Sequence, residues 1–139
     1  MGLQGAALQA ANVMTHNKMF EIMPRLALVA AIVCAVAIAF LSLLPGEDLP
    51  SQNLNDKLNH FIAYGVLTCL AVVGRGSRSF LWVAALAIGY GALLEVLQGI
   101  MPYGRSASTL DALANAGGVV IGVVLAFCVQ GLLRQGRQR

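Results

Sequence analysis

The sequence predicts an all-α integral membrane protein, a bundle of four helices with a polar pocket near the extracytoplasmic side. Of its 139 residues, 58% are hydrophobic and only 11% are charged, whereas soluble domains carry about a quarter charged residues. Long apolar stretches run roughly over 26–44, 58–73, 80–101 and 110–133, and a membrane-spanning helix needs about 20 such residues. The stretches do not alternate with period two, so they predict helices and not a barrel.

The first apolar stretch follows a polar segment, residues 1–24, which we interpret as a loose tail or a short interfacial helix. Pro24 suits the first turn of the first span, because the N–H that proline lacks would be unpaired there. A cleaved signal peptide over 18–44 is the rival interpretation, since the Ala-Ile-Ala sequence at 37–39 is similar to a cleavage site. The apolar run exceeds a signal h-region of about 7–15 residues, so we favour a retained span.

The second apolar stretch is the shortest, so its helix must begin near residues 55–57 or cross a locally thinned bilayer. The third and fourth stretches are long enough to span. The predicted organisation is therefore an N-terminal tail over residues 1–24, a single four-span domain over 25–133 and a basic tail over 134–139.

The distribution of charge predicts how the bundle is oriented. Four spans place both termini on one side, and that side carries most of the basic residues. They are Lys18, Arg25, Arg75, Arg78, Arg134, Arg137 and Arg139. Only Lys57 and Arg105 fall on the other side, together with all the acidic residues except Glu21. The positive-inside rule therefore places both termini in the cytoplasm.

Polar side chains gather near the predicted extracytoplasmic side. In the second span, Asp56, His60 and Tyr64 follow one another at intervals of four residues and share one helix face, which Lys57 borders. Charge inside or beside a bilayer is costly and is usually retained for function. This stripe is therefore a candidate functional site.

The third and fourth spans contribute polar side chains at a similar depth. Glu95 and Gln98 are neighbours on one face of the third span, and Glu95 lies about 9 Å below the outer end at 1.5 Å per residue. In the fourth span, Asp111 and Asn115 are one turn apart. Arg105 lies in the outer loop between these spans. If these faces pack together, the side chains converge in one pocket.

Small residues supply a reason for such packing. Ala114, Gly118 and Gly122 form a ladder at intervals of four residues in the fourth span. A ladder of this kind lets another helix approach closely. We therefore predict that Gly118 and Gly122 are helix-packing residues.

The order of these motifs resembles the VanZ-like family. Within about residues 43–125, the matching motifs are Asp56-Lys57-x-x-His60-Phe61-x-Ala63-Tyr64, Glu95-x-x-Gln98, Gly104-Arg105 and Asp111-x-x-x-Asn115-x-x-Gly118-x-x-x-Gly122. The resemblance implies a small protein of the bacterial cytoplasmic membrane. The founding members of that family are associated with resistance to teicoplanin, an antibiotic that acts on cell-wall precursors outside this membrane. The resemblance implies no agreed molecular activity, and many members occur without a resistance cluster.

We interpret the pocket first as a binding site for a phosphate-bearing headgroup, such as that of a lipid-linked envelope precursor in the outer leaflet. Lys57 and Arg105 are its basic side chains, and arginine suits bidentate phosphate contacts. The predicted ligand-binding residues are Asp56, Lys57, Tyr64, Gln98, Arg105 and Asn115. In the simpler alternative, Lys57 pairs with Asp56, and Arg105 pairs with Asp111.

An enzyme that uses the same pocket for phosphoryl, acyl or glycosyl transfer is the second interpretation. The predicted catalytic residues are His60, Glu95 and Asp111, with His60 as the general acid or base and a carboxylate orienting it. A structural protein, in which His60 only links two helices through Glu95, is a further alternative. A proton-coupled transporter is another, although the apolar cytoplasmic halves of the spans argue against it.

The sequence indicates no metal and no cofactor. A divalent metal on His60, Glu95 and Asp111 is conceivable, but one histidine and two scattered carboxylates are a weak metal signal. The cysteines lie inside spans without metal-type spacing; they are Cys34, Cys69 and Cys128. The expected partners are membrane lipids. The basic residues lack interleaved aromatics, which argues against nucleic-acid binding. Self-association through the Trp82 side or through the first span is left open.

Overall fold

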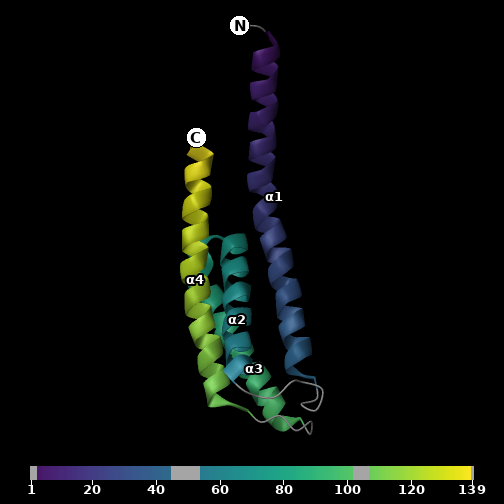
Figure 1. Cartoon of the computed structure of the whole chain (residues 1–139), viewed down its shortest axis with the longest axis vertical. Coiled ribbons are helices and arrows are strands. Elements are labelled where there is room, and N and C mark those ends of the chain that lie inside the picture. Colours follow the sequence, from purple (N-terminus) through teal and green to yellow (C-terminus); the bar gives the residue numbers. More distant parts are fainter. Residues whose placement is uncertain (1–2, 45–53, 102–106, 139) are drawn as a thin grey trace.

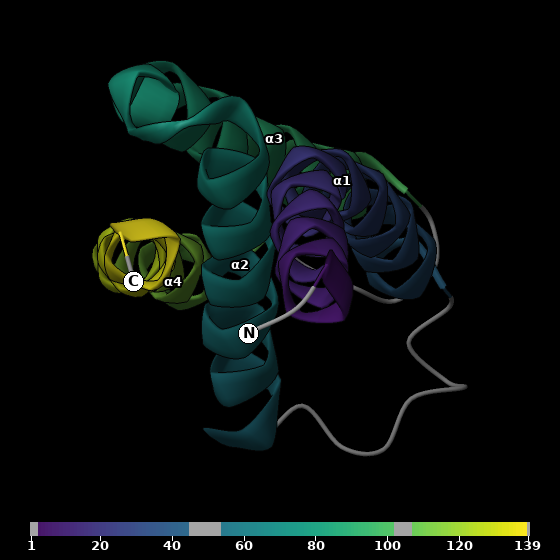
Figure 2. The same ribbon diagram turned by 90° about the horizontal axis from the view of Figure 1, so that it is seen from above.

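The computed structural model describes residues 3–44, 54–101 and 107–138, and these parts of the chain are helical apart from short connections. The long helices are α1 (Leu3–Ser42), α2 (Leu54–Arg75), α3 (Phe80–Ile100) and α4 (Thr109–Gln138). A short 3₁₀ helix, η2 (Ser77–Ser79), joins α2 to α3. Figure 1 shows α1 and α4 running lengthwise through the molecule, and Figure 2, seen from above, shows α2 tilted across them. The predicted all-α class is confirmed for these residues.

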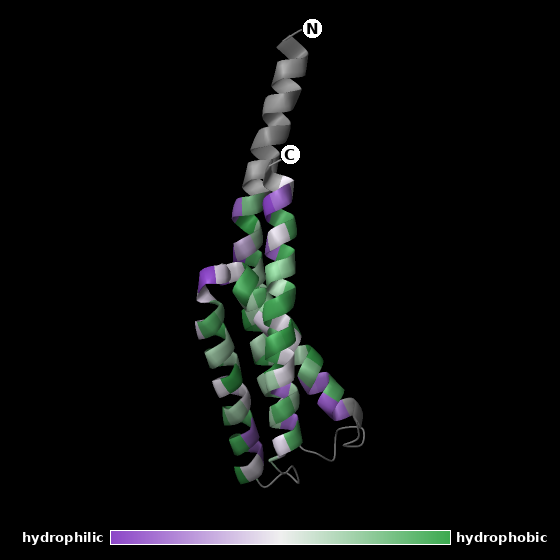
Figure 3. Cartoon of the chain, turned by 90° about the vertical axis from the view of Figure 1, so that its left-hand side faces the viewer, coloured by the Kyte–Doolittle hydropathy of each residue, from purple (hydrophilic) through white to green (hydrophobic). Residues whose placement is uncertain are grey.

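Each long helix contains a segment that is long and apolar enough to cross a membrane. The segments are Phe20–Ser42, Asp56–Arg75, Ser77–Ile100 and Thr109–Gly136, and the third of them begins in η2 and continues through α3. Apolar residues also cover the outer faces of the bundle (Figure 3). On α3, Trp82 and Ile100 are 77% and 74% exposed. Apolar surface left uncovered on this scale is typical of a protein that faces lipid.

α2 is the central helix of the bundle. It packs most extensively on α4 and next on α1, whereas α1 and α3 touch little. Figure 2 shows α2 between α4 and α1. α1 begins and α4 ends at one end of the bundle (Figure 1). The polar beginning of α2 therefore lies at the other end, where α1 and α3 end and α4 begins.

Glycines let α2 and α4 approach each other closely. A Cβ at Gly118 would collide with the carbonyl oxygen of Phe61 in α2, and a Cβ at Gly122 would collide with the carbonyl oxygen of Gly65. Only a residue without a Cβ fits at such contacts. The structure thus places Gly118 and Gly122 at the α2–α4 interface, where they allow the two helices to pack closely.

α1 begins earlier in the chain than the sequence predicts. The helix runs unbroken from Leu3 to Ser42, so the prediction that Pro24 occupies a first turn is wrong. The segment before Pro24 contains good helix formers such as alanine, glutamine and methionine. Extending an existing helix costs less than nucleating a new one, so this segment continues the first span beyond the other helices (Figure 1).

Hydrogen bonds between α2, η2 and α4 close the end of the bundle that carries the basic residues. Gln130 Nε2 donates to the Val72 carbonyl oxygen at 2.9 Å, and Arg134 Nη2 donates to Ser77 Oγ at 3.3 Å. The chain leaves α2 through Gly76, whose φ of 89° is readily adopted only by glycine. These contacts lie far from the polar beginning of α2, which carries the candidate site.

Candidate functional site

An ion pair links the beginnings of α2 and α4. Asp56 and Asp111 lie in the first turns of these two helices, where the helix dipole favours carboxylates. Lys57 Nζ donates to Asp111 Oδ1 at 2.9 Å, and the side chains are 36% and 12% exposed. The pair therefore lies at the rim of the bundle. It joins two helices, whereas the alternative drawn from the sequence paired Lys57 with its neighbour Asp56.

His60 lies one turn deeper and is held from α4. Its Nδ1 lies 3.0 Å from Asn115 Oδ1, and because an amide oxygen only accepts, His60 Nδ1 carries the proton and donates it. In the neutral imidazole, Nε2 then holds a lone pair. Nε2 lies 4.0 Å from Asp56 Oδ1, and the His60 side chain is 10% exposed. The lone pair of Nε2 and the carboxylate of Asp56 thus face each other, and both are hydrogen-bond acceptors. A proton or a cation between them would make this contact favourable.

Tyr64 continues the stripe of α2 into the interior. Its residue is 1% exposed, and its hydroxyl has no hydrogen-bond partner among the described residues. The ring packs 6.3 Å from that of Tyr90 in α3. A Cβ at Gly91 would lie 3.1 Å from Tyr64 Cε1 and 3.1 Å from Asn115 Nδ2, so α3 passes close to these two side chains.

The polar residues of α3 hold the other helices in place. Glu95 is 6% exposed, and its Oε2 accepts from the backbone N–H of Ser108 at 3.0 Å. Gln98 Nε2 donates to the carbonyl oxygen of Ser42, the last residue of α1, at 2.8 Å. Tyr90 donates to the Ala35 carbonyl oxygen at 2.6 Å. These contacts tie α3 to the end of α1 and to the segment that leads into α4.

Ser108 caps α4 and was not among the residues predicted from the sequence. Its hydroxyl oxygen accepts from the backbone N–H of Asp111 at 3.3 Å. A serine three residues before an acidic residue is a known signal for a helix start. This signal could have identified Ser108. The cap fixes the position of Asp111 opposite Lys57.

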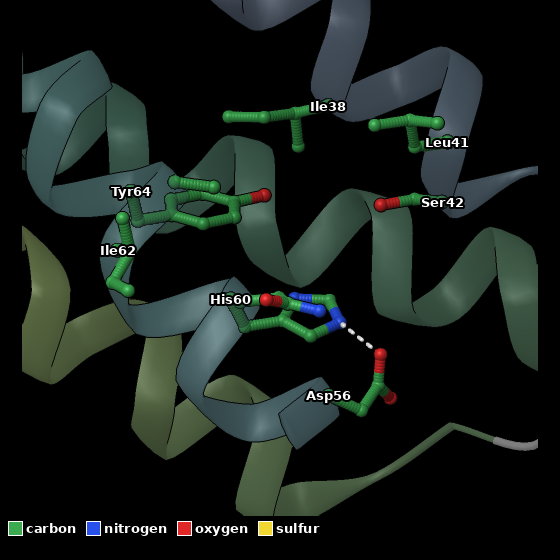
Figure 4. Close-up of a pocket in the computed structure, with 9 residues that line it drawn as sticks. Ile38, Leu41, Ser42, Asp56, His60, Ile62 and Tyr64 are labelled. Carbon is green, nitrogen blue, oxygen red and sulfur yellow. Dashed lines mark ion pairs between the residues drawn. The ribbon is translucent and has the colours of Figure 1, made fainter. Parts of the chain in front are cut away.

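A pocket of about 460 Å³ lies between α1 and α2 at this polar end. Figure 4 shows His60, Asp56 and Tyr64 along one side and Ser42 and Ile38 along the other. Its lining residues are Ile38, Leu41, Ser42, Asp56, Asn59, His60, Ile62, Ala63 and Tyr64. Leu41 and Ile62 are 54% and 52% exposed, so the pocket reaches the outer surface of the bundle. Polar groups and apolar walls meet in this single space.

Two other pockets of similar size occur elsewhere on the described parts of the chain. One contains Thr68, Arg75 and Tyr90 among its lining residues, and the other contains Arg75, Arg78 and Arg134. Neither is lined by a residue of the Asp56–His60–Tyr64 stripe. Size therefore does not distinguish the pocket between α1 and α2 from the other two. The polar side chains of the stripe distinguish it.

Three potential metal ligands converge beside this pocket. Asp56, His60 and Asp111 each offer a donor atom, and these atoms all lie within 4.8 Å of one another. Imidazole nitrogen and carboxylate oxygen are common ligands of divalent transition metals. The weak metal signal in the sequence combined His60 and Asp111 with Glu95, whose Oε2 instead accepts from the backbone N–H of Ser108. Asp56 takes its place in the group.

The structure brings some of the predicted site residues together and gives others different contacts. Asp56, Lys57, His60, Asp111 and Asn115 form one connected group across α2 and α4. Glu95 does not orient His60, since Asn115 occupies that position. The loop residue predicted to bind phosphate, Arg105, lies outside the described residues.

Comparison with known proteins identifies a family. The family model described as VanZ/LLP1 matches residues 10–130. The match begins well before residue 43, where the motif resemblance starts, and it includes much of the N-terminal half of α1. No curated protein and no solved structure matches the chain.

Proposed function

Because the chain belongs to the VanZ/LLP1 family, we propose that it is a bacterial inner-membrane protein that binds a phosphate-bearing headgroup of a lipid-linked envelope ligand. The observation that carries this proposal is the pocket between α1 and α2, in which a polar end and apolar walls adjoin. A lipid-linked ligand has the same division, with a polar headgroup and an apolar chain.

The position of the pocket suits entry from the lipid. Leu41 and Ile62 flank it and are about half exposed on the outer faces of α1 and α2, so a lipid chain can lie against them. The headgroup then reaches Asn59, His60 and Tyr64 without leaving the interface. Ligand sites commonly combine an apolar lining with a few polar groups that orient the ligand.

The charges of the two ends support an outward-facing pocket. Arg75 and Arg134 lie at the end opposite the pocket, and basic residues favour the cytoplasmic side of a bacterial membrane. The proposed topology therefore has both termini in the cytoplasm. The pocket then faces the leaflet in which lipid-linked wall precursors and glycopeptide antibiotics meet.

Among the described residues, Lys57 supplies the positive charge at this site. An ammonium group has three donors, and one of them is used on Asp111. With 36% of its side chain exposed, Lys57 retains donors for a phosphate at the rim. Arg105, outside the described residues, is a second phosphate ligand predicted from the sequence alone.

Native mass spectrometry of the purified protein tests the proposal. We expect the wild type to retain a phosphorylated lipid and the Lys57→Ala variant to retain less of it. Arg78→Ala is the matched control, because it removes an exposed cation at the opposite end. Equal retention in all three proteins would contradict headgroup binding. Teicoplanin susceptibility of cells that express the same variants tests the link to resistance.

The geometry of His60 favours a second candidate, acid–base catalysis on that ligand. Asn115 holds the Nδ1 proton, so Nε2 is free to take a proton, and Asp56 stabilises the imidazolium that results. Asn115 thus has the position of the orienting group, at the ring nitrogen opposite the one that takes the proton, and Asp56 lies beside the nitrogen that takes it. A turnover assay with phosphorylated, acylated and glycosylated lipid substrates tests it, and equal rates in wild type and His60→Gln would remove His60 from the mechanism.

A further inference from the structure

We propose that Asp56, His60 and Asp111 bind one divalent transition-metal ion at the polar end of the pocket between α1 and α2. This inference stands on the geometry of the three side chains, and it also deepens the proposed function by naming what attracts the phosphate. It differs from the expectation drawn from the sequence, because the group that converges contains Asp56 and excludes Glu95.

The spacing of the donor atoms fits a shared ion. All of them lie within 4.8 Å of one another, and His60 Nε2 lies 4.0 Å from Asp56 Oδ1. That separation is too long for a hydrogen bond. Ligand atoms bind Zn²⁺ at about 2.0–2.2 Å, so two ligands of one ion are separated by up to roughly twice that distance. An ion therefore fits between these atoms after a small closure.

Asn115 prepares His60 to act as a ligand. A metal-bound histidine usually donates its other ring N–H to an oxygen acceptor, which fixes the tautomer and the ring orientation. His60 Nδ1 donates to Asn115 Oδ1 at 3.0 Å. Nε2, the nitrogen with the free lone pair, is the one that faces Asp56. The imidazole is thus held in the required tautomer by a residue of a different helix.

Tyr64 provides an independent observation that a ligand belongs here. Its hydroxyl is buried without a partner among the described residues, although a buried polar group without a hydrogen bond costs free energy. Figure 4 shows this hydroxyl pointing into the pocket that Asp56 and His60 line. A water or a ligand oxygen bound to the metal ion would supply the missing partner.

The charge balance favours a cation. Asp56 and Asp111 contribute two negative charges and Lys57 one positive charge, which leaves −1 with a neutral His60. A phosphate is repelled by that sum, whereas a divalent ion reverses it to +1. Lys57 occupies Oδ1 of Asp111, and a carboxylate has a second oxygen for the metal. The mixed nitrogen and oxygen ligands suit Zn²⁺ or Mn²⁺ better than Ca²⁺, which prefers oxygen alone.

Metal titration of the purified full-length protein tests the inference. The protein is prepared without an affinity tag, stripped with EDTA and titrated with Zn²⁺ or Mn²⁺ by calorimetry, and bound ions are counted by elemental mass spectrometry. We expect one ion per chain. Loss of a partner that only orients a ligand costs about 10–100-fold in metal affinity, so Asn115→Ala should weaken binding by that factor. Asp56→Asn and His60→Gln should weaken it at least as much.

Two variants serve as matched controls. His16→Gln removes the other histidine of the chain, and Glu21→Gln removes an exposed carboxylate of α1. Neither should change the affinity. Asp56→Asn preserves side-chain shape, and without metal it should still unfold in a single cooperative transition, which separates loss of a ligand from loss of folding. Absence of stoichiometric binding in the wild type, or equal affinity in wild type, Asp56→Asn and His60→Gln, would overturn the metal site.

A second measurement separates this inference from the proposed function. Lipid retention is compared in the stripped and the metal-loaded protein. Retention that rises with metal supports both proposals. Stoichiometric metal binding without any lipid retention supports the metal site and contradicts headgroup binding. Lipid retention that is unchanged by EDTA in a protein that binds no ion supports headgroup binding and overturns the metal site.

Discussion

His60 Nδ1 and Asn115 Oδ1 lie 3.0 Å apart, although the two residues are separated by 55 positions in the chain. The contact joins α2 to α4 at the depth where the glycines of the two helices allow close approach. It also determines which nitrogen of His60 faces Asp56. Both candidate chemistries of the site, metal binding and proton transfer, depend on this contact.

Asn115→Ala should destabilise the protein by about 1–3 kcal/mol, because the buried imidazole N–H loses its acceptor. Asn115→Asp should not restore that stability, because its oxygen still accepts from Nδ1 but a further negative charge is buried beside Asp56 and Asp111. Thermal unfolding in detergent, followed by circular dichroism, compares the two variants. Equal unfolding temperatures for Asn115→Ala and the wild type would show that the contact does not contribute to stability.

Gly118→Ala should destabilise the bundle, because the new Cβ collides with the Phe61 carbonyl oxygen of α2. Inserting a methyl group into a packed interface costs about 1–3 kcal/mol. Gly131→Ala is the matched control on the same helix, where a Cβ meets nothing within 4 Å. Replacing glycine in an open helical position gains up to about 1 kcal/mol. Thermal unfolding should therefore shift in opposite directions, and equal shifts would contradict the close α2–α4 contact.

In the metal-free protein, Tyr64→Phe should leave stability unchanged or increase it, because the hydroxyl it removes has no partner among the described residues. Tyr90→Phe is the matched comparison, because it removes a hydrogen bond to the Ala35 carbonyl oxygen. Interhelical hydrogen bonds in membranes are worth about 0.6 kcal/mol on average, so Tyr90→Phe should lower stability by about that amount. A stability loss in Tyr64→Phe larger than in Tyr90→Phe would show that the Tyr64 hydroxyl has a partner.

Cysteine labelling tests the proposed orientation. In a chain whose native cysteines are replaced, Ala107→Cys places a thiol at an exposed position just before α4, and Gly136→Cys places one near the exposed end of that helix. A membrane-impermeant maleimide should label Ala107→Cys in intact cells and Gly136→Cys only after the membrane is permeabilised. The reverse pattern would place the pocket on the cytoplasmic side.

Hydropathy was sufficient to predict the number of long apolar helices, because lipid requires continuous apolar surface on each span. The start of α1 was predicted incorrectly. Pro24 is compatible with a first turn and also with the interior of a long helix, and local sequence does not distinguish the two when the preceding residues favour helix. The structure places this proline inside α1.

The sequence by itself determined the all-α class, the membrane-spanning lengths and the residues that share a helix face, because each depends only on composition and the helical repeat. It placed Asp56, His60 and Tyr64 on one face for that reason. Only the tertiary structure decided the partners across helices. Small differences in rotation and in closest approach determine whether His60 meets Glu95 or Asn115, and at the α2–α4 interface the glycine contacts select Asn115. These contacts depend on how two faces dock, which no single helix encodes.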